Sequence, residues 1–137
     1  MIQLLAGAKG TGKTKRLLNM ANQSVKTTDG TIVYIDDDKR HIYDLHYDIR
    51  FVGTEGYPLS DCRVFTGFIC GILSQNSDIE KIYIDGLTNI IGFVDGEGLI
   101  KLHDELDTIS KGNNVSFVIS VNWDEDKLPE NIREFVI

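Results

Sequence analysis

Cysteine and proline are both scarce in this chain, which contains two of each. Cys62 and Cys70 form neither a C-x-x-C pair nor part of a four-ligand zinc pattern. This spacing excludes a zinc-ribbon or disulfide-framework protein. A chain of 137 residues can bury about two-thirds of its unfolded surface, so it needs no such cross-link for stability. We expect both cysteines to be reduced core thiols, because Cys70 falls within an apolar helical stripe.

Long apolar runs and an excess of basic residues are also missing. The N-terminal apolar segment is too short for a signal peptide or a membrane span, so we expect a cytoplasmic protein. The chain carries 14 basic and 21 acidic residues, a net charge of −7. Nucleic-acid affinity comes mostly from phosphate neutralisation, so this balance argues against autonomous binding of DNA or RNA, although a local basic face stays open. No repeat or linker interrupts the chain, which predicts a single domain over residues 1–137.

What the sequence does contain is a phosphate-binding pattern near its start. Residues 7–14 match G-x-x-x-x-G-K-[ST] at every fixed position. Glycines allow backbone N–H groups to turn toward a phosphate, Lys13 supplies a positive charge, and the Thr14 hydroxyl can ligate Mg²⁺. The alternative is a glycine-rich turn without a ligand. The residues expected to bind nucleotide are Gly7, Ala8, Lys9, Gly10, Thr11, Gly12, Lys13, Thr14 and Lys15.

The segments that flank this loop favour a phosphate site. Residues 2–6 are apolar and predict a buried strand, and the helical spacing of Leu17, Leu18, Ala21 and Val25 predicts a helix after the loop. A helix that starts directly after the loop aims the positive end of its dipole at the bound anion. Strand, glycine loop and helix is therefore the arrangement that phosphate binding requires.

Strand and helix signals alternate along the rest of the chain. Residues 31–35, 50–53, 81–84 and 115–121 predict strands. Ser60 or Asp61 can cap a helix whose apolar stripe comprises Val64, Phe65, Phe68, Ile69, Ile72 and Leu73. A further helix carries Leu99, Leu102, Leu106 and Ile109 and ends near Gly112. Right-handed crossovers between such elements predict an α/β fold, a three-layer sandwich with a mainly parallel central sheet.

Polar side chains follow several of these predicted strands. Asp36 and Asp38 follow the strand at 31–35, Asp85 follows the strand at 81–84, and Asn122 follows the last strand. The carboxyl ends of parallel strands meet at one edge of a sheet, where ligands bind. We therefore expect these side chains to gather beside the glycine loop.

The chain resembles a P-loop NTPase, and more narrowly the RecA-like (ASCE) branch of that family. The resemblance rests on the octapeptide at residues 7–14, on Ile84-Asp85 as a Walker B strand end, and on the order of the elements. The resemblance implies that the ligand is Mg-ATP or Mg-ADP and that Lys13 bridges the β- and γ-phosphates of ATP. It also implies that Thr14 lies on Mg²⁺ and that Asp85 holds the metal through water. It implies that Asp38 orients the attacking water and that Asn122 senses the γ-phosphate. Lys13 and Asp38 are thus the catalytic candidates.

The position of Asp38 departs from the family pattern. The family has Glu there, and the shorter Asp38 must have a closer water or a shifted strand end to act as a base. Asp36 or Asp37 could take that role, or the three carboxylates could simply be a solvated turn. We expect ATP hydrolysis that is weak or that depends on a partner, either a second copy of the chain or a larger protein. Arg133 could serve a neighbouring subunit as an arginine finger.

Other function classes make different demands on the sequence. A GTPase should carry Asn-Lys-x-Asp, which is absent. A small-molecule or nucleoside kinase would share the core but usually carries a lid with several arginines, and none is visible. The main alternative to an ATPase is a switch or assembly module that binds nucleotide without hydrolysing it. A structural adaptor with a vestigial loop is a further alternative.

Overall fold

All five strands of the protein run parallel in one sheet, in a computed structural model that describes residues 1–137. The strands are β1 (Ile2–Ala6), β2 (Thr31–Asp36), β3 (Arg50–Gly53), β4 (Ile79–Ile84) and β5 (Ser116–Val121). The helices are α1 (Lys13–Ser24), α2 (Cys62–Gln75), α3 (Leu87–Ile91), α4 (Gly96–Asn113) and α5 (Glu130–Arg133), with short 3-10 turns at Ile42–Asp44 and Glu125–Lys127. None of the helices is both long enough and apolar enough to span a bilayer.

The strand order is β1-β5-β4-β2-β3, so β5 lies between the strand before the glycine loop and the strand before Asp85. Leu4 pairs with Ile119, Ile119 with Ile84, and Ile84 with Ile35 across four neighbouring strands. This register brings the carboxyl ends of β1, β5, β4 and β2 to one edge of the sheet. The expected parallel arrangement of these strand ends is confirmed.

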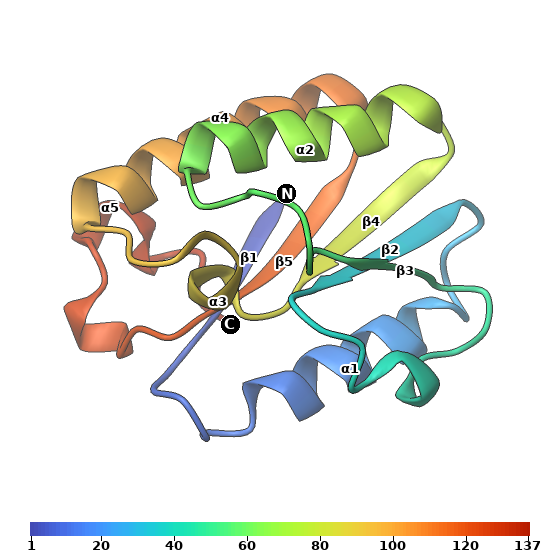
Figure 1. Cartoon of the computed structure of the whole chain (residues 1–137), viewed down its shortest axis with the longest axis horizontal. Coiled ribbons are helices and arrows are strands. Elements are labelled where there is room, and N and C mark those ends of the chain that lie inside the picture. The colour runs from blue at the N-terminus through green and yellow to red at the C-terminus, as the bar shows by residue number, and fades with distance from the viewer.

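Helices cover both faces of the sheet (Figure 1), which makes an α/β/α sandwich. Because side chains alternate along a strand, Ile35 faces the layer that contains α2 and α4, whereas its neighbour Tyr34 faces α1. Phe65 and Leu106 anchor the larger core cluster on the first face, and Leu17 anchors the smaller one on the second. The expected three-layer architecture agrees with this arrangement.

The outer side of α2 corrects two expectations. Both cysteines are free thiols, but Cys70 is exposed and therefore not a core thiol, whereas Cys62 is partly buried and packs against the larger core cluster. Val64 is exposed as well, although it belongs to the predicted apolar stripe. Phe65 and Ile69 are the only fully buried residues of this helix, because only a narrow stripe of α2 faces the core. Val64, next to Phe65 in sequence, points about 100° away from that stripe. The short helix α3 had no clear signal in the sequence.

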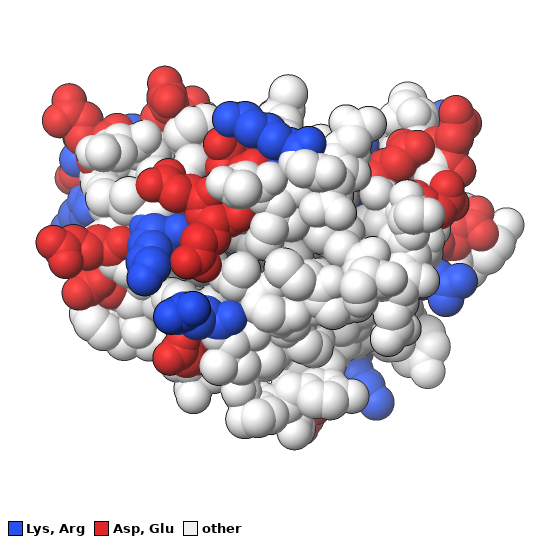
Figure 2. Space-filling view, turned by 90° about the horizontal axis from the view of Figure 1, so that it is seen from above, with Lys and Arg blue, Asp and Glu red and all other residues white.

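Charge is unevenly spread on the side of the molecule formed by α2 and α4. Figure 2 shows acidic groups gathered in patches there, with basic groups dispersed between them and a wide uncharged area in the middle. No continuous basic surface is visible on this face.

Candidate nucleotide-binding site

Residues 7–14, called the glycine loop below, lead from β1 into the first turn of α1 through backbone conformations that suit glycine. Gly10 and Gly12 both have φ of 86°, in the left-handed region. A side chain with a Cβ costs about 1–2 kcal/mol in that region. Gly12 is the N-cap of α1 and offers no side chain to cap it. The loop therefore delivers an uncapped helix end to the edge of the sheet.

The first turn of α1 carries an unusual set of charges. It contains Lys13, Lys15 and Arg16, and it has no acidic residue. Cations at a helix N-terminus oppose the helix dipole and normally weaken a helix by a few tenths of a kcal/mol each, about 0.3–1. The same charges become favourable when an anion lies against the exposed N–H groups. This helix end has the electrostatics of an anion site.

Lys13 lies folded into the glycine loop. Its Nζ donates to the carbonyl oxygens of Gly7 at 2.7 Å and Ala8 at 2.8 Å. Burial lowers the pKa of Lys13, while the nearby Asp85 carboxylate acts in the opposite direction. The ammonium group is thus held at the loop, where a phosphate would accept its hydrogen bonds.

Asp85 is the central carboxylate of the site and is only 5 % exposed. Its Oδ1 accepts from Thr14 Oγ1 at 3.2 Å and from Ser120 Oγ at 3.1 Å, and its Oδ2 accepts from the Tyr34 hydroxyl at 2.8 Å. The Ser120 hydroxyl also accepts from the backbone N–H of Gly86 at 2.7 Å. Side chains from α1, β2 and β5 therefore fix both oxygens of one carboxylate at the end of β4.

Tyr34 and Ser120 contact Asp85 directly, and the sequence reasoning gave neither of them a role in the site. Tyr34 lies in an apolar strand and reads as a core aromatic, and it is indeed fully buried. Burial and then the Asp85 carboxylate raise the pKa of Tyr34 above its usual range, so its hydroxyl stays protonated as a donor. The only available signal for Ser120 was a hydroxyl within an otherwise apolar strand.

The three consecutive carboxylates at the end of β2, Asp36, Asp37 and Asp38, have different surroundings. Asp36 is 5 % exposed and accepts from the N–H of Asp37 at 2.7 Å. Burial, with contributions from the neighbouring carboxylates Asp37 and Asp85, raises the pKa of Asp36 to about 8. Asp38 instead accepts from the backbone N–H of Arg40 and from its guanidinium, each at 2.9 Å. These contacts hold the pKa of Asp38 below its ordinary value.

A pocket of about 350 Å³ lies where these elements meet. It is lined by Lys9, Gly10, Gly12, Lys13, Thr14, Arg40, His41, Asp85, Gly86, Asn89, Ser120 and Asn122. The structure thus gathers the main loop residues, Asp85 and Asn122 around one space. Asp38 does not line it, and neither do Gly7, Ala8, Thr11 and Lys15, although these four belong to the loop and the helix start. Arg40, His41 and Asn89 are additions that the sequence reasoning had not proposed.

The donor set at the base of this pocket suits a magnesium ion. Thr14 and Asp85 present a hydroxyl and a carboxylate oxygen 3.2 Å apart. Hard oxygen donors such as these are the ligands that Mg²⁺ prefers, and the ion keeps several waters in sites of this kind. The residues present therefore fit the metal that was expected here.

Arg133 lies outside this pocket and is bound to its own backbone. Its Nε donates to the carbonyl oxygen of Leu128 at 2.8 Å, and its Nη2 donates to that of Asp126 at 2.7 Å. The arginine tethers the C-terminal segment in this chain.

In comparisons with known proteins, the chain matches no family model and no curated sequence.

Proposed function

We propose that this protein binds Mg-ATP as a P-loop nucleotide-binding protein of the RecA-like kind and hydrolyses it weakly or with the help of a partner. The observation that carries the proposal is the start of α1, an uncapped helix end with three cations and no acidic residue in its first turn. Lys13 and Thr14 of this helix end line one pocket together with Asp85, whose carboxylate accepts from the Thr14 hydroxyl. An anion that also holds a divalent metal satisfies both features at once.

The roles of the side chains follow from their positions. Lys13 reaches the β- and γ-phosphates from within the loop, and its present carbonyl partners, Gly7 and Ala8, are given up when phosphate oxygens replace them. Thr14 would hold Mg²⁺ directly and Asp85 would hold it through water. When bound, the metal neutralises charge on the phosphates. Asn122 follows β5, between β1 and β4, and it senses the γ-phosphate from that central position.

Weak hydrolysis agrees with the state of the carboxylates. Asp36, with a pKa of about 8, is mostly protonated at neutral pH and cannot accept a proton from water. Asp38 is ionised, but it is paired with Arg40 and lies outside the pocket lining. Asp38 can orient the attacking water only after that pair opens. The same observation favours the alternative in which the protein is a switch that binds nucleotide and does not turn it over.

Calorimetric titration with Mg-ATP and Mg-ADP tests the proposal. The wild-type chain should bind both nucleotides, and Lys13→Ala should weaken each by about 10- to 100-fold, since a hydrogen bond to a charged group contributes about 1.5–3 kcal/mol. Lys101→Ala is a matched control, because Lys101 is exposed on α4 and lies outside the pocket. Absence of binding by the wild type, or equal affinities for Lys13→Ala and Lys101→Ala, would contradict the proposal.

A further inference from the structure

The segment between β2 and β3 folds back along α1 as a strap, here defined as residues 37–46. Asn22 on α1 fixes its far end with two hydrogen bonds, from Asn22 Nδ2 to the Asp44 carbonyl oxygen at 2.9 Å and from the His46 N–H to Asn22 Oδ1 at 2.8 Å. Leu45 packs against the same core cluster as Leu18. The helix that begins at the glycine loop therefore also positions the strap.

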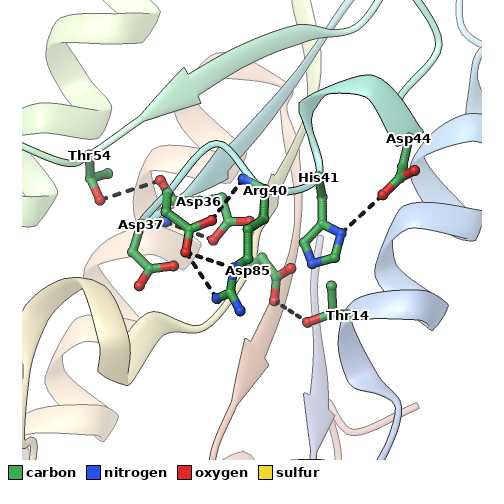
Figure 3. Close-up of polar contacts among 9 residues, drawn as sticks. Thr14, Asp36, Asp37, Arg40, His41, Asp44, Thr54 and Asp85 are labelled. Atoms are coloured by element: carbon green, nitrogen blue, oxygen red, sulfur yellow. Dashed lines mark hydrogen bonds and ion pairs between the residues drawn. The ribbon is translucent and has the colours of Figure 1, made fainter.

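The strap places Arg40 and His41 on the wall of the phosphate pocket that the glycine loop does not provide. In Figure 3 the His41 ring points toward Thr14, and the Arg40 side chain lies next to Asp85. Three cationic side chains line the pocket, those of Lys9, Lys13 and Arg40, and the only carboxylate that lines it is that of Asp85. This local excess of positive charge occurs in a chain whose net charge is −7.

The glycine loop forms one wall of the pocket and the strap forms another, and each is suited to a different part of the ligand. The glycine loop and the start of α1 hold one end of a polyphosphate chain, while Thr14 and Asp85 hold the metal. The rest of the pocket lining comprises Arg40 and His41 of the strap together with Gly86, Asn89, Ser120 and Asn122, so a phosphate beyond that metal would be within reach of the strap. We propose that Arg40 contacts the terminal phosphate of a nucleoside triphosphate from within the same chain and so makes the site prefer ATP to ADP. This inference rests on the proposed nucleotide-binding function.

The ion pair between Arg40 and Asp38 is compatible with that role. The Arg40 side chain is 74 % exposed and that of Asp38 is 33 % exposed, so their pairing is screened by water and contributes little to stability. Arginine forms charge-assisted bonds with carboxylate and phosphate alike. A terminal phosphate is the stronger partner because it carries up to about two negative charges, whereas Asp38 carries one. Asp38 therefore holds Arg40 beside the pocket until a phosphate is present. Transfer of Arg40 to the phosphate then releases Asp38, the carboxylate assigned to water.

Affinities for Mg-ATP and Mg-ADP, measured separately by calorimetry, test this inference. Arg40→Ala and Arg40→Gln should each weaken binding of Mg-ATP about tenfold or more and leave binding of Mg-ADP within twofold of the wild type. Arg40→Lys should retain part of the preference. Arg63→Ala is the matched control, because Arg63 is an exposed arginine on α2, on the other side of the sheet. Circular dichroism should show that all variants fold, since Arg40 lies on an exposed turn.

The outcomes separate this inference from the function on which it rests. Wild-type protein that binds neither nucleotide overturns both. Wild-type binding that is lost in Lys13→Ala but unchanged in both Arg40 variants leaves the nucleotide site standing and overturns the role of Arg40. An equal loss of Mg-ATP and Mg-ADP affinity in the Arg40 variants overturns the preference for the terminal phosphate.

Discussion

The hydrogen bond from Tyr34 to Asp85 should be a measurable part of the stability of the fold. Substitution of Tyr34 by Phe removes only the hydroxyl from a fully buried ring, so the packing against α1 is kept. The Oδ2 atom of Asp85 then loses its donor at 2.8 Å inside a site where the residue is 5 % exposed. A hydrogen bond to a charged group contributes about 1.5–3 kcal/mol, and we expect Tyr34→Phe to lower the free energy of unfolding by about 2 kcal/mol.

Tyr83 provides the matched control for this substitution. It pairs with Tyr34 across β2 and β4 and is also buried, but its hydroxyl donates to the Met20 carbonyl oxygen at a long 3.4 Å. A bond so far beyond the usual O–H···O distance is weak. Tyr83→Phe should therefore cost no more than about 0.5 kcal/mol, at the low end for neutral hydrogen bonds.

Urea unfolding without nucleotide or Mg²⁺ measures both variants. The fluorescence of Trp123, the single tryptophan, gives a local probe because its carbonyl oxygen accepts from the N–H of Gly7 in the glycine loop. With a slope of about 2 kcal/mol/M, the midpoint of Tyr34→Phe should fall by roughly 1 M. Equal midpoints for Tyr34→Phe and Tyr83→Phe would refute the view that buried hydroxyl donors hold the Asp85 carboxylate in place.

Three further substitutions test other parts of the site. Asp38→Asn should abolish ATP turnover in a phosphate-release assay and leave Mg-ATP affinity within about twofold; unchanged turnover would remove Asp38 from its role. Asp36 keeps its proton up to about pH 8 in the folded state, whereas the unfolded chain loses that proton near pH 4. The free energy of unfolding should therefore fall progressively as the pH rises from about 4 to about 8. Asp36→Asn should flatten that decline in metal-free urea titrations, and parallel curves for the two proteins would contradict it. Gly12→Ala should destabilise the fold by about 1–2 kcal/mol because φ is 86° there. Its control Gly71→Ala, in open space on α2, should stabilise the fold by about 0.5–1 kcal/mol, and thermal melting that shifts both variants in the same direction would refute this account.

Local features of the site could be predicted from the sequence because their causes are local. The glycines at positions 10 and 12, the apolar run of β1 and the helical spacing of α1 lie within 25 residues, and each constrains the backbone directly. The parallel order of strands followed from their alternation with helices, which placed Asp85 and Asn122 on one edge with the loop. Whether nucleotide binds there, and whether it is hydrolysed, stay predictions.

Contacts between distant parts of the chain could not be predicted in the same way. Nothing within β2 distinguishes Tyr34 from a core aromatic, because its partner Asp85 lies 51 residues away. The three consecutive carboxylates at 36–38 looked interchangeable in sequence. In the structure, burial raises the pKa of Asp36, whereas Asp38 forms an ion pair with Arg40. The exposure of Cys70 likewise depends on where α4 packs against α2 rather than on the apolar character of the helix.

The sequence by itself determined the glycine loop, the helix that follows it and the alternation of strands and helices, because short-range sterics and periodic burial set these features. The tertiary structure alone decided which side chains surround Asp85 and which wall of the pocket carries Arg40. Strand register and the path of the strap set those positions, and both depend on the packing of segments far apart in the chain.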